Sequence, residues 1–368
     1  MIRKIFVLTM LFFLLSCANN LRVNEFMYPA SSCPGFFSLE DTSSLGELKL
    51  GYSLSSPPAV LGNLAFFGTN QKRVVVVDLL SGEIVRRFWF GTTITVSPSV
   101  SDSFIVVAGK GDWNQLSAYS LLDGRRLWEK EAEMPVVSSR IVDEDVFVLL
   151  RNGKLFHISM SDGKIMRKLK FDGLFTGAPV YTEKSLVVYS VSGDVYSVST
   201  APEMEIRSKA KLASRLSGNA ILLDSLIVFP VESGHLLFLD KNLNQVKQIS
   251  LPSGSSWSFP VAVVEYNNLF FVSTRDGGIL AMNFAGDVLW QDSFDDVFLY
   301  PVAVFDDFVL AGGARGDLYN IDINTGELIW EKRIFSPIVG QPFGFCGRVF
   351  VPTESGQIFL LPGFGSSE

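Results

Sequence analysis

Few residues of this chain have the types and spacing that catalysis requires. Its two histidines, His157 and His235, fall in separate predicted β-strands, so they do not form a metal cluster with each other. Acidic residues are numerous, but nearly all of them lie in predicted turns. The sequence also lacks a Ser-His-Asp order, a phosphate-binding loop and a dinucleotide-binding fingerprint. We therefore expect no enzyme activity, no metal and no cofactor.

The cysteine nearest the N-terminus, Cys17, has the sequence context of a modified thiol. Basic residues near the start, an apolar run over 5–15 and the small residue Ser16 precede it. This order is typical of a secretory signal, and the run is too short to cross a bilayer as a helix. The segment resembles the signal of bacterial lipoproteins. That resemblance implies cleavage before Cys17 and lipidation of its thiol by acyl chains such as palmitate.

The lipoprotein signal sets the expected organisation and location. We expect a signal peptide over 1–16, a linker from the lipid over 17–44 and one folded region over 45–368. Loss of Arg3 and Lys4 with the signal changes the formal net charge from −7 to −9, which argues against nucleic acid as a partner. Ala18 stands where many inner-membrane lipoproteins have Asp. Its presence favours the outer membrane, with the protein facing the periplasm.

A repeat of about forty residues is the strongest pattern in the sequence. Equivalent positions recur every 40 or 41 residues, at Pro58, Pro98, Ser139, Pro179, Asn219, Pro260, Pro301 and Pro342. Each unit contains short runs of aliphatic and aromatic residues separated by Gly, Asn and Asp, which predict four antiparallel strands. Eight such units predict an all-β, eight-bladed β-propeller of four-stranded antiparallel blades.

The last unit has only three predicted strands before the chain ends. Upstream of the first unit, residues 45–50 resemble the Gly-Glu-Leu-Ile-Trp fourth strand of the seventh unit. We therefore expect the N-terminal strand to complete the last blade, which removes two open sheet edges. Cys33 precedes this strand and Cys346 lies in the blade it completes. A Cys33–Cys346 disulfide would clamp the ring, whereas two unpaired thiols, with Cys346 buried, are the alternative.

One unit contains the complete motif Asp-x-x-Thr-Gly-x-x-x-Trp, from Asp322 to Trp330, and partial copies end at Trp128 and Trp290. The motif resembles the PQQ-like repeat of bacterial propellers, and the resemblance covers about residues 45–363. The recurring Trp positions are expected to pack blade against blade. Quinoprotein dehydrogenases share these repeats, but they also need a cofactor pocket, a metal and a catalytic acid, and many have a vicinal Cys-Cys pair that is missing here.

An exported lipoprotein that consists of this ring alone resembles the BamB family of accessory lipoproteins in outer-membrane β-barrel assembly. The resemblance implies a non-catalytic, monomeric scaffold within a complex, anchored to the membrane by its lipid. Its implied partners are a BamA-like barrel insertase and unfolded outer-membrane proteins. Two alternatives stay open: a PQQ-binding quinoprotein-like enzyme or sensor, and an envelope lipoprotein with an unrelated protein partner.

One face of the propeller is expected to carry the binding surface. Turns between second and third strands share a face with the connections between blades, and this face has Trp113 in a long turn and Trp257 in a Ser- and Gly-rich connection. Neither Trp stands at the packing position of the repeat. Exposed aromatic residues beside arginine are typical of protein-binding hot spots. The basic candidates on this face are Lys72, Arg73, Arg275 and Arg315; the alternative is that both rings fold back onto their blades.

Overall fold

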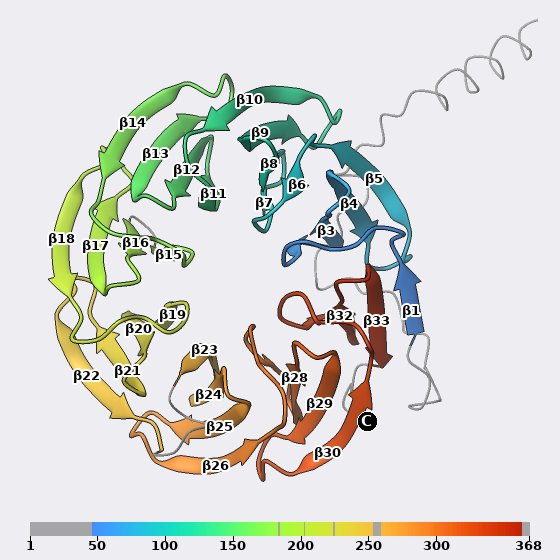
Figure 1. Cartoon of the computed structure of the whole chain (residues 1–368), viewed down its shortest axis with the longest axis vertical. Coiled ribbons are helices and arrows are strands. Elements are labelled where there is room, and N and C mark those ends of the chain that lie inside the picture. The colour runs from blue at the N-terminus through green and yellow to red at the C-terminus, as the bar shows by residue number, and fades with distance from the viewer. Residues whose placement is uncertain (1–45, 183–184, 202, 224, 253–258, 363–368) are drawn as a thin grey trace, which may run out of the picture.

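The computed structural model describes residues 46–182, 185–201, 203–223, 225–252 and 259–362. Secondary structure in these ranges is entirely β, and eight sheets surround a central axis (Figure 1). None of the described residues form a helix that could cross a membrane. The prediction of an eight-bladed all-β propeller is confirmed. The expected signal peptide, the linker, Cys17, Cys33 and Trp257 lie outside the described residues.

Blades 1–4 follow one another along the chain, and each strand pairs with the next in antiparallel fashion. Blade 1 comprises β2 (Ala59–Leu61), β3 (Leu64–Gly68), β4 (Arg73–Asp78) and β5 (Ile84–Trp89). Blade 2 comprises β6 (Thr93–Ile94) and β7 (Ser99–Val100), which both pair with β8 (Phe104–Lys110), then β9 (Asn114–Ser120) and β10 (Arg126–Ala132). Blade 3 comprises β11 (Val136–Val142), β12 (Asp145–Leu150), β13 (Lys154–Ser159) and β14 (Ile165–Lys170). Blade 4 comprises β15 (Val180–Thr182), β16 (Ser185–Tyr189), β17 (Asp194–Ser199) and β18 (Ile206–Lys211).

The other four blades complete the ring. Blade 5 comprises β19 (Ile221–Leu223), β20 (Leu226–Val231), β21 (His235–Leu239) and β22 (Gln245–Ser250). Blade 6 comprises β23 (Pro260–Tyr266), β24 (Leu269–Thr274), β25 (Gly278–Asn283) and β26 (Val288–Ser293). Blade 7 comprises β27 (Ala303–Val304), β28 (Phe308–Gly312), β29 (Asp317–Asp322) and β30 (Leu328–Arg333). Blade 8 comprises β31 (Phe343–Phe345), β32 (Arg348–Pro352), β33 (Gln357–Pro362) and, as its outer strand, β1 (Gly46–Lys49).

The N-terminal strand closes the ring, as the sequence predicts, because β1 pairs antiparallel with β33. Its register differs from the one suggested by the similarity to the seventh unit. That similarity aligns Gly46 with Gly326. In the structure Gly46 pairs with Leu360, and the position in blade 7 that corresponds to Leu360 is Asn320, whose partner is Trp330. Gly46 therefore corresponds to Trp330 and not to Gly326. The closing strand therefore lies four residues away from the position that the motif suggests.

Cys346 lies on the two-residue turn between β31 and β32. Both turn residues have positive φ, 47° at Cys346 and 66° at Gly347, as a type I′ hairpin turn requires. Cys346 is half-buried and takes part in a disulfide. Because the partner lies outside the described residues, the pairing with Cys33 stays a prediction.

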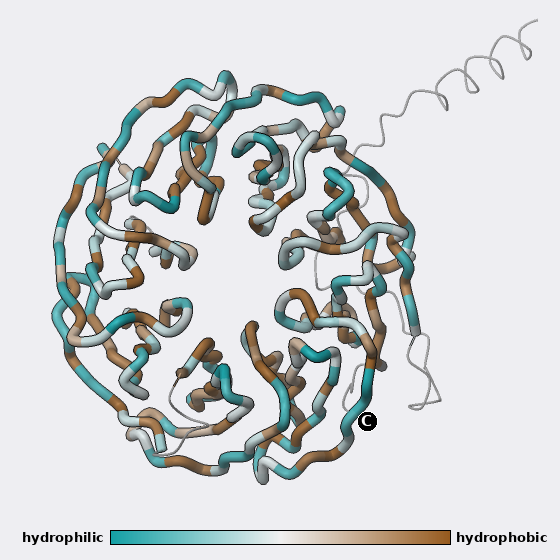
Figure 2. Tube along the Cα trace, viewed as in Figure 1, coloured by the Kyte–Doolittle hydropathy of each residue, from teal (hydrophilic) through white to brown (hydrophobic). Residues whose placement is uncertain are grey.

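The core consists of eight apolar clusters, one between each pair of adjacent blades. Most residues of the second and third strands are buried, and β3 is buried along its whole length, since neighbouring blades cover both faces of these strands. Outermost strands such as β10 have one covered face, and hydrophilic and hydrophobic residues alternate along them (Figure 2). The seams between blades therefore carry the apolar burial that stabilises the ring.

In blades 1–7 a β-bulge in the outermost strand re-aims one residue toward the seam with the next blade. In blades 1–7 the pairing of the third and fourth strands skips one residue, and the next residue pairs at the fourth position of the third strand, or at the fifth in blade 2. Such bulges re-aim side chains. We call the residue after the bulge the seam residue. The seam residues of blades 1–7 are Arg86, Trp128, Arg167, Ser208, Lys247, Trp290 and Trp330.

Two of the tryptophan seam residues, Trp128 and Trp290, combine packing with a hydrogen bond to the next blade, and Trp330 packs against the cluster between blades 7 and 8. The indole N–H of Trp128 donates to the Met160 carbonyl at 2.7 Å, and that of Trp290 donates to the Ile323 carbonyl at 2.7 Å. The motif glycine of the next blade lies against each ring: a Cβ on Gly326, for example, would stand 2.6 Å from the Trp290 ring. The prediction that these tryptophans pack blade on blade is thus confirmed, and the turn glycine leaves room for the indole.

Replacement of Trp290 by alanine should lower the free energy of unfolding by about 3–5 kcal/mol, because it removes a ring that is 7% exposed and leaves a carbonyl without its donor. The matched control is Leu289→Ala at the adjacent bulge, where the side chain is 53% exposed and the expected change is within about 0.5 kcal/mol. Urea unfolding followed by circular dichroism measures both. Equal shifts of the two midpoints would show that the seam does not depend on the indole.

Candidate protein-binding surface

One face of the ring collects the turns between second and third strands and the connections between blades, and we call it the connection face. Hydrogen bonds join the two kinds of segment: the Phe171 N–H donates to the Gly153 carbonyl at 2.9 Å, and the Arg275 N–H donates to the Phe259 carbonyl at 2.9 Å. Four of the five described candidates lie in turns of this kind, and Arg73 is the first residue of β4 directly after such a turn; the other four are Lys72, Trp113, Arg275 and Arg315. They belong to blades 1, 2, 6 and 7, so they share a face but do not form a single site.

The side chains of Arg315, Arg275 and Trp113 differ in their exposure and in their hydrogen bonds. Arg315 is fixed by its own surroundings, since its guanidinium donates to the Asp295 carbonyl at 2.7 Å and to Asp295 Oδ1 at 2.8 Å. Arg275 is exposed and borders a cavity of about 440 Å³ together with the exposed side chains of Phe259 and Leu174. Trp113 is partly buried at the tip of its turn.

Arg73 belongs to an aromatic cluster at the end of β5. Its guanidinium lies over the Trp89 ring, 5.2 Å from the centroid, and 5.8 Å from that of Tyr52. Trp89 is 59% exposed, and the Lys72 carbonyl accepts a hydrogen bond from the N–H of Phe90 at 2.9 Å. An exposed indole beside a guanidinium has the composition of an interface hot spot. Sequence reasoning missed Trp89, although its place outside the packing position of the repeat was visible.

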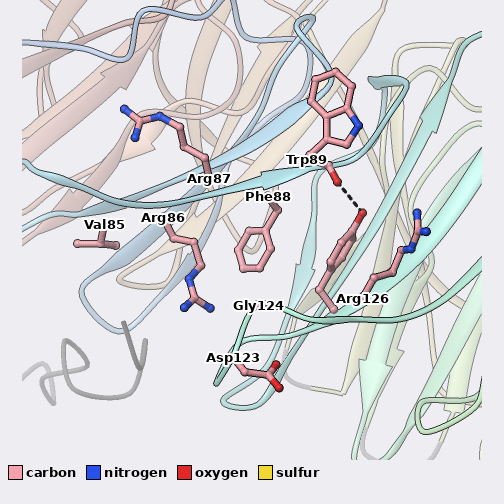
Figure 3. Close-up of a pocket in the computed structure, with 9 residues that line it drawn as sticks. Val85, Arg86, Arg87, Phe88, Trp89, Asp123, Gly124 and Arg126 are labelled. Atoms are coloured by element: carbon pink, nitrogen blue, oxygen red, sulfur yellow. Dashed lines mark hydrogen bonds between the residues drawn. The ribbon is translucent and has the colours of Figure 1, made fainter. Parts of the chain in front are cut away.

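A groove of about 660 Å³ adjoins this cluster along the seam between blades 1 and 2 (Figure 3). The seam residue Arg86 points toward Asp123 and Gly124 of blade 2, and its guanidinium donates to the Leu121 carbonyl at 3.0 Å. Arg87 and Arg126 also border the groove; Asp123 is the acidic residue of the lining, and Arg126 forms an ion pair with Glu129. The groove is therefore cationic and has an aromatic wall.

Three titratable groups of this groove have shifted pKa values. Burial lowers the pKa of Arg86, and the nearby Asp123 carboxylate opposes this effect. A hydrogen bond from the Arg125 N–H lowers the pKa of Asp123. Burial raises the pKa of Tyr119, whose hydroxyl donates to the Trp89 carbonyl at 3.0 Å. At neutral pH the groove thus presents guanidinium groups and a neutral phenol, which suits an acidic or carboxylate-bearing partner.

A second arginine–aromatic pair lies on the connection face at the end of blade 7. Phe335 is 82% exposed, and the Arg333 guanidinium lies 5.5 Å from its ring centroid. Its φ of 60° is unusual for a bulky residue and marks backbone strain of the kind found at functional sites. Blade 8 separates this pair from the Arg73–Trp89 pair, so both flank the closing blade. Nothing in the sequence pattern distinguishes Phe335 from the buried phenylalanines.

Comparison with known proteins identifies the family. A family model described as outer membrane protein assembly factor BamB matches residues 37–257 and 263–361. The chain belongs to the BamB family. Among curated BamB proteins, that of Burkholderia pseudomallei is 28% identical over 146 residues, 39% of this chain and 37% of that protein. The BamB of Shewanella oneidensis is 19% identical over 317 residues, 84% of this chain and 72% of that protein.

Solved structures share the fold. The crystal structure of BamB from Moraxella catarrhalis superposes with a TM-score of 0.73 at 15% identity, over 88% of this chain and 98% of that one. The designed propeller Ika8 gives 0.72 at 15% identity, over 85% and 97%. Yeast Sqt1 gives 0.70 at 12%, over 87% and 98%. Because proteins with different names share the architecture to the same degree, the fold does not select a function within it.

Two adjacent arginines of β5 should differ in their effect on stability. Arg86→Met removes the hydrogen bond to the Leu121 carbonyl and should lower the free energy of unfolding by about 1–3 kcal/mol. Arg87→Met removes the same charge from an exposed side chain and should change it by no more than about 0.5 kcal/mol. Urea unfolding of the two variants side by side tests this. A larger loss in Arg87→Met would contradict the structural role given to the seam residue.

Proposed function

We propose that this BamB-family protein is a non-catalytic scaffold that assists the assembly and insertion of outer-membrane β-barrel proteins. The family match over residues 37–257 and 263–361 carries the proposal. We further propose that the protein is a lipoprotein at the periplasmic face of the outer membrane. Its direct partners in this role are a BamA-like barrel insertase and unfolded outer-membrane proteins.

The insertase is proposed to dock on the sector formed by blades 7, 8 and 1 of the connection face. Support comes from the two arginine–aromatic pairs, Arg73–Trp89 and Arg333–Phe335, whose rings are 59% and 82% exposed. Large exposed rings with guanidinium neighbours supply the apolar area and the charge-assisted contacts of a protein interface. The groove beside Trp89 adds three arginines, which favour an acidic partner segment.

Replacement of Trp89 by alanine should weaken binding of a barrel insertase about tenfold or more, as loss of an interface anchor does. The measurement is co-purification of the tagged, lipidated protein from gently solubilised envelopes, with partners identified by mass spectrometry. Leu289→Ala, which shortens an equally exposed side chain on blade 6, is the matched control and should retain the insertase. Recovery of the insertase with both variants would place the docking site elsewhere, and no recovery with the unchanged protein would refute the assembly role.

The membrane anchor is proposed to be a lipid on Cys17, and Cys33 is proposed as the disulfide partner of Cys346. The first rests on the signal-like segment that ends at Ser16. The second is supported by the disulfide at Cys346 in a chain with three cysteines, one of which the lipid would occupy. Loss of a native disulfide lowers stability by about 2–5 kcal/mol, so this bond would stabilise the closing blade.

Two cysteine variants separate the roles. Cys17→Ala should release the protein from the membrane fraction, because no acyl chain then holds it. Cys33→Ala should stay in the membrane fraction but expose the Cys346 thiol to a maleimide reagent. Fractionation and a gel-shift assay under non-reducing conditions measure the two outcomes. Membrane retention of Cys17→Ala would refute the anchor, and a blocked Cys346 thiol in Cys33→Ala would refute the pairing.

A further inference from the structure

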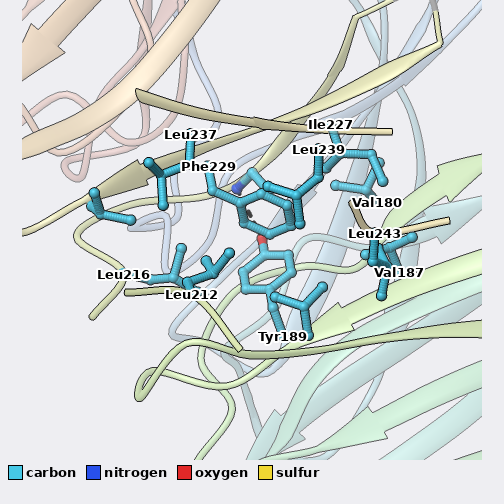
Figure 4. Close-up of a cluster of buried hydrophobic side chains, with 13 residues drawn as sticks. Val180, Val187, Tyr189, Leu212, Leu216, Ile227, Phe229, Leu237, Leu239 and Leu243 are labelled. Atoms are coloured by element: carbon cyan, nitrogen blue, oxygen red, sulfur yellow. Dashed lines mark hydrogen bonds between the residues drawn. The ribbon is translucent and has the colours of Figure 1, made fainter. Parts of the chain in front are cut away.

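The seams that blades 1–7 form with the next blade contain a second recurring residue near the connection face. It follows the seam residue by four positions, and we call it the end residue. In six of these blades it is large and apolar, and its backbone N–H donates to the carbonyl of the residue that precedes the third strand. Leu212 of blade 4, for example, lies beside Leu216 in the buried cluster between blades 4 and 5 (Figure 4). The end residues of blades 1–7 are Phe90, Ala132, Phe171, Leu212, Leu251, Phe294 and Ile334. Blade 2 is thus the exception, because its end residue is an alanine.

In two other seams a phenylalanine end residue covers an aromatic ring of the next blade. The ring centroids of Phe171 and Tyr196 lie 4.7 Å apart, and those of Phe294 and Tyr319 also lie 4.7 Å apart. Both tyrosines stand at the third position of the third strand, and they are 4% and 3% exposed. Phe156 has this position in blade 3, but it is only half-buried, and no described aromatic residue contacts its ring. One face of this ring therefore lacks the cover that the other seams provide.

A cavity of about 170 Å³ lies between Ala132 and Phe156, which both line it, and we call it the blade 2–3 pocket. The buried side chains of Leu116, Val148 and Leu150 add to its apolar lining. All these residues belong to the range 46–182, which the structure describes without a gap. An apolar cavity of about 150 Å³ can hold a benzene molecule. The pocket therefore has the size and the lining to receive one aromatic ring.

Two exposed carboxylates of blade 2, those of Glu131 and Glu133, border the pocket. Glu133 accepts a hydrogen bond from Lys154 Nζ at 2.6 Å, which lowers the pKa of its carboxyl group and keeps it charged. Glu131 forms no ion pair with any residue that the structure describes. Lys130 also borders the pocket, but its side chain runs toward the next blade, where a Cβ on Gly163 would stand 3.0 Å from Lys130 Cε. The edge of the pocket thus offers a carboxylate to a basic group.

We propose that the blade 2–3 pocket receives an aromatic side chain, best a phenylalanine, from an unfolded outer-membrane protein segment that carries a basic residue beside it. The bound ring would pack against Phe156 as Phe171 packs against Tyr196 in the next seam, and the basic residue would pair with Glu131. The pocket lies outside the sector of blades 7, 8 and 1 proposed for the insertase. Strands of outer-membrane barrels carry girdles of aromatic residues, so these proteins supply such segments. The choice of partner rests on the proposed function, whereas the preference for a ring rests on the pocket alone.

The test uses the full-length protein and a fluorescein-labelled extended peptide, Ser-Thr-Lys-Phe-Lys-Thr-Ser, with a second peptide that has Ala in place of Phe. Fluorescence anisotropy should show at least about tenfold tighter binding of the phenylalanine peptide, because only this peptide buries a ring. Ala132→Phe fills the pocket with a ring of the protein's own and should abolish that preference while the unfolding midpoint stays equal or rises. Leu289→Phe, which adds the same ring at an exposed site on blade 6, should keep the preference.

Equal binding of both peptides by the unchanged protein, or no binding of either, would overturn the proposal. So would a preference that survives Ala132→Phe, or a dimer in light scattering that Ala132→Phe dissociates, since the occupant would then be a second copy of the chain. Glu131→Lys provides an independent variant at the edge of the pocket and should weaken binding of the phenylalanine peptide at least about tenfold. An unchanged affinity would contradict the pairing with a basic neighbour. Co-purification of an insertase is scored separately, so the pocket can hold while the assembly role fails, or the reverse.

Discussion

Contact between neighbouring blades is the constraint on which the rest of this structure depends. The sheets share no central core, and each apolar cluster belongs to one pair of blades. A bulge in the outer strand turns one side chain toward the seam. In a strand without the bulge, regular alternation would point this side chain along the sheet surface. At Trp290 that side chain fills the seam and also satisfies a carbonyl of the next blade. The same backbone irregularity recurs in blades 1–7 and adds to the eight apolar clusters that join the sheets into one domain.

The same position also creates the chemical differences between seams. Trp128 closes its end of the seam, Arg86 borders a cationic groove beside an exposed indole, and Ser208 borders a cavity that the buried side chains of Val187 and Ile227 also line. The backbone around the three is alike, because the bulge and the strand pairing are the same. A propeller can therefore acquire a binding site by substitution of one packing residue, without a change of fold.

The sequence predicts the blade number, the strand order and the ring closure, because short apolar runs and turn residues recur every 40 or 41 residues. It does not predict the register of β1. The other outer strands follow a turn that fixes their pairing, whereas β1 enters from the N-terminal segment and is placed by burial of Leu50, which is 2% exposed. The exposure of Trp89 and Phe335 cannot be predicted from the sequence either, because it depends on which residues of neighbouring blades cover these rings. The basic turn residues were placed on the correct face because turn order alone determines it.

The proposed anchor and the proposed docking surface have different tasks. The 28 residues between Cys17 and Gly46 can span at most roughly 100 Å, so a lipid on Cys17 would restrict where the ring is but hardly how it is turned. A Cys33–Cys346 bond would shorten the free tether to the segment between Cys17 and Cys33, roughly 50 Å at most, and would attach it to the β31–β32 turn of blade 8. Even then the ring could rotate about that point. Orientation toward a partner must come from contacts on the ring itself, and the exposed arginine–aromatic pairs on both sides of blade 8 are placed to supply them.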